Sequence, residues 1–396
     1  MLSVSFGVYV HIPYCLQRCP YCDFAVIEMT EEISRDSSFE KYTSLVIEEI
    51  QQRSASVGAR RISSLYFGGG TPSLVEPGLL SKIVESLRKE GFELETDYEM
   101  TLEINPGTIT EKSLREWVAI GVNRFSVGAQ SFDDGLLKKI GRKHSSKDTR
   151  ATLELLHGAG LNFTLDILFA LPGQTRTMLL KDAEAALTYS PPHVSVYCLT
   201  LPDKHPLNDG RPEDIQQAEM FEDMEKILAS GGLTRYEVSN YSKPGRESRH
   251  NRLYWSDDEY WGVGLSAHSY LKKSEWGVRF WNSPGLKSYS DHIASTRLRG
   301  PATPFDGLPE NQVEILAINQ AMTDYCHTHL RTLTRGVTER GLKDKFPPRE
   351  ASEIMRRLEK LHEKGLVDSS QGRWVLSRNG RLLADRVFEE LTFLKN

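Results

Sequence analysis

Short runs of β-branched and aromatic residues alternate with longer amphipathic segments over the first 230 or so residues of this 396-residue chain. Such alternation favours a parallel sheet, because each helix carries the chain back to the same end of the sheet. Six strand–helix units are compatible with an open doubly wound sheet or with a partial barrel, and the spacing alone does not decide between them. The predicted strands are Gly7–His11, Ser63–Phe67, Tyr98–Ile104, Asn123–Gly128, Asn162–Leu168 and His193–Leu199.

Three of the five cysteines, Cys15, Cys19 and Cys22, form a C-x3-C-x2-C loop directly after the first predicted strand. Clustered thiolates bind zinc or an iron–sulfur cluster, and His11 could complete a Cys3His zinc site. Zinc sites usually consist of two separated ligand pairs, whereas three cysteines on one loop can hold a 4Fe–4S cluster with one open iron. An odd number of unevenly spread cysteines does not favour a disulfide framework.

Glycines and polar residues follow the later strands, at the end of a parallel sheet where ligands bind. The three glycines of "YFGGGTPS" permit close approach of a ligand to the backbone, and the stretch lacks the Gly-Lys-Ser/Thr of a triphosphate-binding loop. Glu103, Gln130 and Asp166 lie at the third, fourth and fifth strands. Each of them alone has a purely structural explanation, but together they predict one site at the rim of a barrel.

The cysteine loop, with Tyr21 before its last cysteine, resembles the signature of the radical S-adenosylmethionine (SAM) superfamily. That resemblance implies an α/β fold with a partial (β/α)6 barrel, and SAM chelating the open iron of a 4Fe–4S cluster held by the three cysteines. Further motifs, among them "LEINPG", "DILFALPGQT" and "SRHNRLYW", narrow the resemblance to the coproporphyrinogen oxidase-like family over nearly the whole chain. In that family SAM contacts positions that match Tyr9, Gly69, Gly70, Thr71, Glu103, Gln130, Arg142 and Asp166.

Two functions share this family's scaffold, an oxygen-independent coproporphyrinogen III oxidase and a heme chaperone. The oxidase carries a further cysteine where this chain has Phe24, and a longer segment before the cluster than the 14 residues that precede Cys15. The stretch "HNRLYW" matches the HNxxYW motif of the chaperone branch, which implies that His250 binds heme. We therefore predict a chaperone that binds heme and passes it to acceptor proteins, membrane-associated respiratory proteins among them, with no catalytic residue assigned and with the oxidase as the alternative.

The region around His250 is rich in aromatic and basic residues that suit a porphyrin. Aromatic rings can pack on the porphyrin plane, arginines can pair with its propionates and a histidine can bind its iron. His268 is a second candidate ligand, although its alternative role is packing at the open side of the barrel. The residues in question are Trp255, Trp261, Trp276, Trp281, Tyr241, Tyr254, Tyr260, Tyr270, Arg246, Arg249, Arg252 and Arg279.

Changes in pattern divide the chain into three parts. We predict a barrel over residues 1–235, an aromatic-rich connecting region over 236–300, and a C-terminal, winged-helix-like domain over 301–396 with a hairpin turn at Gln371-Gly372. A net charge of −5 gives no reason to expect nucleic acid as a partner. The sequence has no leader-like start and no apolar run of about 18 residues, so a cytoplasmic protein is expected, and a homodimer is a further expectation.

Overall fold

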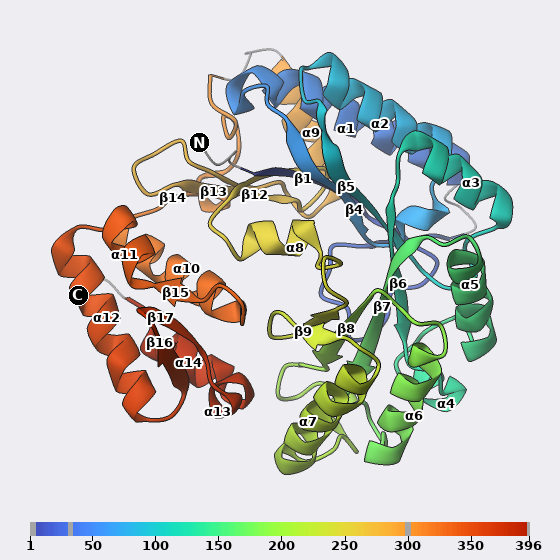
Figure 1. Cartoon of the computed structure of the whole chain (residues 1–396). Coiled ribbons are helices and arrows are strands. Elements are labelled where there is room, and N and C mark those ends of the chain that lie inside the picture. The colour runs from blue at the N-terminus through green and yellow to red at the C-terminus, as the bar shows by residue number, and fades with distance from the viewer. Residues whose placement is uncertain (1–4, 31–34, 298–301, 394–396) are drawn as a thin grey trace.

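The computed structural model describes residues 5–30, 35–297 and 302–393, and its centre is a 12-stranded sheet (Figure 1). The strand order is β14-β13-β12-β11-β1-β4-β5-β6-β7-β8-β10-β9, and the strands from β11 to β8 run parallel to one another. These parallel strands curve into a partial barrel, which confirms the predicted fold class. The six predicted strands are β1 (Phe6–Ile12), β4 (Ile62–Gly69), β5 (Leu94–Ile104), β6 (Arg124–Gln130), β7 (Asn162–Phe169) and β8 (His193–Cys198).

Each barrel strand separates apolar from polar side chains by simple alternation. In β6, Phe125 and Val127 are fully buried on the outer face, whereas Arg124 and Ser126 point to the inner face. Each apolar side chain that is covered in this way stabilises the fold by about 1.5–3 kcal/mol. The outer face of the six strands is built from Val8, Val10, Leu65, Phe67, Met100, Leu102, Phe125, Val127, Leu165, Ile167, Val194 and Val196.

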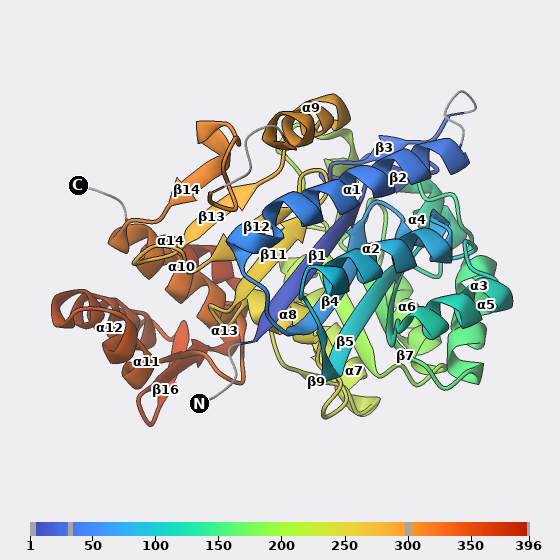
Figure 2. The same ribbon diagram turned by 90° about the horizontal axis from the view of Figure 1, so that it is seen from above.

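In the described part of the chain, seven helices cover the outer face of the barrel (Figures 1 and 2). Helix α3 shows why these segments fold as predicted, because Thr110 and Ser113 form a capping box and Gly121 ends the helix in a left-handed conformation. None of the described helices is long and apolar enough to cross a membrane. The covering helices are α1 (Arg35–Val57), α2 (Pro77–Lys89), α3 (Glu111–Ile120), α4 (Asp134–Lys139), α5 (Ser146–Gly158), α6 (Arg176–Leu187) and α7 (Asp214–Ser230).

Residues 236–297, in the stretch that the sequence set apart as a connecting region, extend the sheet at both of its edges. Strand β10 (Asn240–Ser242), with β9 (Thr234–Arg235), is added beside β8, and β11 (Glu259–Val263), β12 (His268–Leu271) and β13 (Val278–Trp281) are added beside β1. Helix α8 (Arg249–Tyr254) lies against the inner face of the sheet, whereas α9 (Leu286–Arg297) packs beside α1 on the outside. The sheet edge ends with β14 (Val313–Ile315).

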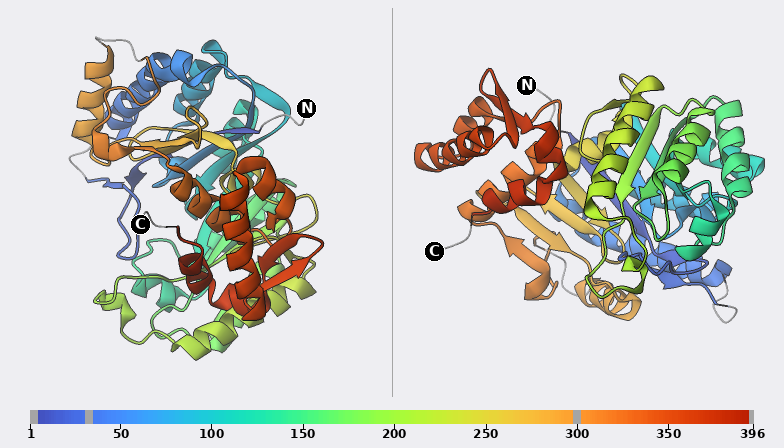
Figure 3. Two further views of the ribbon diagram at one scale, coloured as in Figure 1. Left: turned by 90° about the vertical axis from the view of Figure 1, so that its left-hand side faces the viewer. Right: turned by 90° about the horizontal axis from the view of Figure 1, so that it is seen from below.

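The C-terminal residues form a separate lobe with its own hydrophobic core (Figure 3). Helix α12 buries Ala351, Ile354, Leu358 and Leu361, which follow the three-and-four spacing of one helix face. The predicted hairpin is present, and its turn at Gln371-Gly372 has positive φ at both residues. The lobe comprises α10 (Ile318–Arg331), β15 (Val337–Thr338), α11 (Glu339–Lys345), α12 (Pro348–Glu363), β16 (Val367–Ser370), β17 (Arg373–Leu376), α13 (Arg378–Leu382) and α14 (Ala384–Glu390).

A buried ionic network fastens α1 to the edge strands and to α9. The side chains of Glu49 and Arg53 are 0% and 1% exposed and form an ion pair with an N–O distance of 2.8 Å. The Glu49 carboxylate also accepts hydrogen bonds from the Tyr289 hydroxyl at 2.6 Å and the Asn282 amide at 2.7 Å. Arg53 in turn contacts the ring of His292. Because both charges are excluded from water, the network depends on every partner being present.

Candidate functional site

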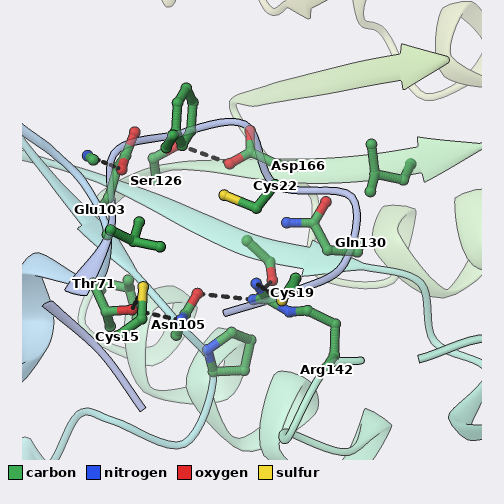
Figure 4. Close-up of a pocket in the computed structure, with 18 of the residues that line it drawn as sticks. Cys15, Cys19, Cys22, Thr71, Glu103, Asn105, Ser126, Gln130, Arg142 and Asp166 are labelled. Atoms are coloured by element: carbon green, nitrogen blue, oxygen red, sulfur yellow. Dashed lines mark hydrogen bonds between the residues drawn. The ribbon is translucent and has the colours of Figure 1, made fainter. Parts of the chain in front are cut away.

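The cysteine loop lies across the mouth of the barrel and lines a cavity of about 510 Å³ (Figure 4). The loop leaves the end of β1 and begins with the short strand β2 (Tyr14–Cys15). It ends with β3 (Ile27–Glu28), which pairs with β2. Other loops of the same rim hold it in place, since Pro20 accepts a hydrogen bond from the His205 ring at 3.1 Å. The Cys19 thiol lies 3.7 Å from the carbonyl oxygen of Gly141.

The three thiols line one cavity but do not form a compact single-ion site. In the described ranges, no group of three or more His, Cys, Asp or Glu side chains is close enough to hold one metal ion. His11 is also not free, because one ring nitrogen is bonded to the Tyr9 hydroxyl at 3.1 Å and the other to the carbonyl of Ala25 at 2.9 Å. The Cys3His zinc alternative therefore does not fit, whereas three separated thiols around a cavity suit a larger cluster.

Burial sets the protonation of the cysteine ligands. Removal from water raises the pKa of the Cys15 thiol, with the Thr71 hydroxyl opposing this shift, and burial likewise raises the pKa of the Cys22 thiol. Both groups are therefore thiols at neutral pH, and binding a metal through sulfur would require them to lose their protons. Arg142 lies 4.0 Å from the Cys19 sulfur and supplies a positive charge beside the loop.

The glycines at the end of β4 are required by the packing of the cysteine loop. A Cβ on Gly69, whose φ is +113°, would lie 2.5 Å from the His11 ring, and a Cβ on Gly70 would lie 2.7 Å from the carbonyl oxygen of Tyr14. The backbone N–H of Gly70 donates to Ile12 at 2.7 Å. The sequence reading gave these glycines the role of admitting a ligand, and the structure adds that they bring β4 close to the start of the loop.

Two carboxylates on the inner face, those of Glu103 and Asp166, line the same cavity. Glu103 accepts hydrogen bonds from the Tyr66 hydroxyl at 2.7 Å and from the Gly69 N–H at 3.0 Å. Burial raises its pKa to about 7, and the neighbouring Asp166 carboxylate adds to this shift. Burial also raises the pKa of Asp166, which accepts a hydrogen bond from Ser126 at 3.1 Å. A buried pair of this kind favours a ligand that brings a positive charge.

A chain of polar contacts connects the far side of the cavity to the cysteine loop (Figure 4). Arg142 donates to the Asn105 side chain at 2.8 Å and to the carbonyl of Gly128 at 2.7 Å. Asn105 donates to the Thr71 hydroxyl at 2.8 Å, and this hydroxyl lies 3.5 Å from the Cys15 sulfur. Gln130 has a φ of +65° at an irregularity of β6, which directs the end of this strand toward the cavity.

Most of the residues predicted to contact SAM line this one cavity. They are Gly69, Gly70, Thr71, Glu103, Gln130, Arg142 and Asp166, and the three cysteines line it as well. Tyr9 is not among the lining residues. Its ring lies beside Tyr66, with ring centroids 6.0 Å apart, and its hydroxyl is bonded to His11. Tyr9 therefore lies behind the cavity wall and supports Tyr66 and His11.

Several cavity residues were not identified from the sequence. They share the inner face of the barrel strands, and three of them lie two residues from Glu103 or Asp166. Because strand residues alternate between faces, the phase of Glu103 and Asp166 would have pointed to Thr101, Asn105 and Thr164. The additional lining residues are Tyr66, Thr101, Asn105, Arg124, Ser126, Thr164, His193, Ser195 and Tyr197.

The "HNRLYW" motif lies on α8, and its residues have different surroundings. The side chain of His250, the predicted heme ligand, is 1% exposed, and its two ring nitrogens are bonded to Ser64 at 2.8 Å and Tyr254 at 2.9 Å. Burial lowers its pKa to about 3. Asn251 lines the cavity, whereas Trp255 packs on Arg331 of the C-terminal lobe at 5.1 Å. In this conformation, therefore, neither nitrogen of His250 is available to iron, and its binding of heme stays a prediction.

The tryptophans that the sequence grouped together do not form one patch. Trp261 is fully buried on the outer face beside Phe92, and Trp276 stacks on Phe346 of the C-terminal lobe. The arginines separate in the same way, because Arg249 pairs with Asp97, and Arg279 pairs with Asp324 and Glu314. Trp281 alone of these tryptophans stacks on a histidine ring, that of His268.

Comparisons with known proteins agree with this geometry. Residues 9–186 match the family model of the radical SAM superfamily. The chain is 38% identical to the heme chaperone HemW of Lactococcus lactis over 73% of this chain and 75% of that protein. It is 31% identical to the heme chaperone HemW of Bacillus subtilis over 96% of this chain and 98% of that protein.

A solved structure shows the same fold over nearly the whole chain. It is that of HemN, the coproporphyrinogen III oxidase of Escherichia coli, a radical SAM enzyme, with a TM-score of 0.80 and 21% identity. The match covers 98% of this chain and 90% of HemN. The barrel, the cysteine loop at its mouth and the similarity to curated relatives over 75% and 98% of their lengths lead to one conclusion: this chain belongs to the HemW family of the radical SAM superfamily.

Proposed function

We propose that this protein is a heme chaperone, which binds heme and passes it to acceptor proteins. The observation that carries the proposal is the similarity to the HemW heme chaperones, which extends over 96% of this chain in the case of Bacillus subtilis. The residue at position 24 supports it. Phe24 is 56% exposed beside the cavity, at the position where the oxidase branch carries a further cysteine.

Membership of the radical SAM superfamily implies a 4Fe–4S cluster and SAM, and the cavity fits both. Cys15, Cys19 and Cys22 would hold the cluster, and its fourth iron would remain open to SAM. When bound, this pair of cofactors supplies one-electron chemistry at the mouth of the barrel. The protein's own contribution is to orient SAM, through the carboxylates of Glu103 and Asp166 and through the Arg142, Asn105 and Thr71 contacts, and to cover the cluster with its loop.

The charge state of Glu103 is expected to control SAM binding. Its pKa of about 7 means that it gains a negative charge as the pH rises from 6 to 7, while the sulfonium group of SAM is positively charged at both pH values. We expect the affinity of cluster-loaded protein for SAM to rise roughly fivefold over this range. Glu103→Gln should bind SAM more weakly and should lose this rise. Anaerobic titration calorimetry at both pH values measures the effect.

A second buried carboxylate provides the matched control for this prediction. Burial also raises the pKa of Asp182, to about 6, but Asp182 is bonded to Ser131 and Phe132 away from the cavity. Asp182→Asn should therefore keep the pH dependence of the parent protein. An unchanged rise in the Glu103→Gln variant would show that another group governs the binding of SAM.

The choice between chaperone and oxidase can be tested on one anaerobic preparation. We expect cluster-loaded protein to bind hemin with a red-shifted Soret band and to pass it to a heme-free acceptor protein. The same preparation should release no carbon dioxide from coproporphyrinogen III in the presence of SAM and a reductant, because Phe24 replaces the additional oxidase cysteine. HemN of Escherichia coli serves as the positive control for decarboxylation. Decarboxylation by this protein at a comparable rate would establish the oxidase instead.

A further inference from the structure

A heme chaperone needs a side chain that binds the heme iron, and the histidines of this chain differ sharply in their availability. Of the eleven histidines, nine have at least one ring nitrogen engaged in a hydrogen bond. Among these nine, His193 has an Nδ1 that lacks a hydrogen-bond partner within the described residues, but the residue is only 1% exposed. In the part of the chain that the structure describes, His157 and His268 are the two with no such bond, and both are exposed. His157 lies in the last turn of α5 on the outside of the barrel, with no aromatic ring recorded against it.

The surroundings of His268 suit a residue that binds a flat aromatic molecule. It is the first residue of β12, and its ring stacks on that of Trp281 of β13, with centroids 5.3 Å apart and planes at 16°. The two residues are direct partners in the antiparallel pairing of these strands, so the backbone holds the stack in place. An imidazole that is steadied by an indole on one side keeps its nitrogens free at the ring edge.

The position of His268 is fixed on the side of the barrel that carries the cavity. Gly262 of β11 is paired with Tyr9 of β1, and a Cβ on Gly262 would lie 2.2 Å from the carbonyl oxygen of His268. This approach, which only glycine permits, places His268 against β11, one strand away from the middle of β1. Tyr270, two residues after His268 on β12, contacts Tyr260, which in turn contacts Tyr254 of α8. These side chains therefore share the inner face of the sheet with His268.

The electrostatic surroundings keep the His268 ring neutral. Partial burial lowers its pKa, and the positive charge of Arg279 lowers it further. A neutral imidazole offers a lone pair to iron, whereas a protonated one does not. His250, by comparison, would have to break its bonds to Ser64 and Tyr254 and leave a buried position before it could bind iron.

On these grounds, and resting on the proposed chaperone function, we propose that His268, supported by Trp281, binds the iron of heme. The coordinate bond forms between a ring nitrogen and the iron, with no change in oxidation state. An exposed ligand leaves the opposite side of the iron accessible. A histidine of an acceptor protein can then attack from that side, which suits a protein that releases its heme.

The experiment is a hemin titration of full-length protein, read by the Soret band and by electron paramagnetic resonance. We expect His268→Ala to lower hemin affinity roughly ten- to a hundredfold and to remove the histidine signature, with added imidazole restoring it. His268→Cys should bind hemin with a thiolate spectrum, which shows that the residue at this position touches iron. Trp281→Leu should weaken binding without changing the ligand type. His157→Ala, which removes the other exposed imidazole, should behave as the parent protein.

The possible outcomes distinguish a failure of the His268 proposal from a failure of the proposed chaperone function. If His268→Ala binds hemin as tightly as the parent with the same Soret band, the proposal is overturned while the function stands. If His250→Ala removes the histidine signature and His268→Ala does not, the ligand is the one predicted from the sequence. If the parent protein binds no hemin at all, the proposed function fails and His268 is not a heme ligand. Circular dichroism and thermal melting of each variant confirm that it is folded.

Discussion

Cys19→Ala protein, reconstituted anaerobically with iron and sulfide, is expected to hold almost no iron, whereas the parent protein should hold about four irons per chain. Cys19 lies in the cavity lining at the mouth of the barrel, and two cysteines are too few to hold a cluster that needs three. Because SAM is expected to chelate the open iron, the same variant should also lose SAM binding. Iron analysis and the visible absorption spectrum give the first result, and calorimetry gives the second.

The chain supplies its own control for this prediction in Cys198, an exposed cysteine at the end of β8. Cys198→Ala should retain the full iron content, because Cys198 is not part of the cysteine loop. Stoichiometric zinc and no iron in the reconstituted parent protein would contradict the assignment of the loop. A Cys19→Ala protein that bound SAM with unchanged affinity would contradict chelation by the open iron.

The largest loss of stability is expected when one member of the buried ionic network is removed. Arg53→Leu leaves the carboxylate of Glu49 without its cation in a position that is 0% exposed. We expect the free energy of unfolding to fall by about 3–5 kcal/mol, since an uncompensated buried charge costs this much. Urea unfolding followed by tryptophan fluorescence and circular dichroism measures the change.

An exposed ion pair with the same helical spacing gives the matched control. Arg115 and Glu111 are also four residues apart, but their side chains are 68% and 70% exposed. Arg115→Leu should change the free energy of unfolding by no more than about 0.5 kcal/mol, because water already screens this pair. If the free energy of unfolding fell by a similar amount in the two variants, burial of the Glu49–Arg53 pair would not add to its contribution to stability.

The six barrel strands and the cysteine loop were predictable because their signals are local. Alternation of apolar residues, a glycine after a helix and three closely spaced cysteines each act over a few residues, and the structure places them as expected. The Gln371-Gly372 turn belongs to the same class. The pairing of β11 with β1 was not predictable in this way, because their residues are about 250 positions apart and the intervening sequence carries no signal of adjacency.

The same difference between local signals and long-range packing applies to the residues of the candidate site. Glu103 and Asp166 were identified because they interrupt apolar strands, whereas Asn105 and Arg124 were missed although they share the same cavity. The reading of His250 rested on a motif, and a motif does not show burial or hydrogen bonding. Whether a histidine has a free nitrogen depends on residues such as Ser64, which comes from a distant strand. Long-range packing therefore decides which members of a motif can reach a ligand.

The alternation of the barrel strands has a consequence for how this scaffold diverges. Substitutions at outward positions such as Val127 disturb packing under the helices and are therefore constrained by stability. Substitutions at inward positions such as Ser126 and Thr164 alter the chemistry of the cavity while the covering helices keep their contacts. A lineage can thus exchange one set of inner residues for another without first losing its fold. This separation of outward and inward positions permits two proteins to keep the same barrel at low sequence identity, as this chain and HemN do at 21%.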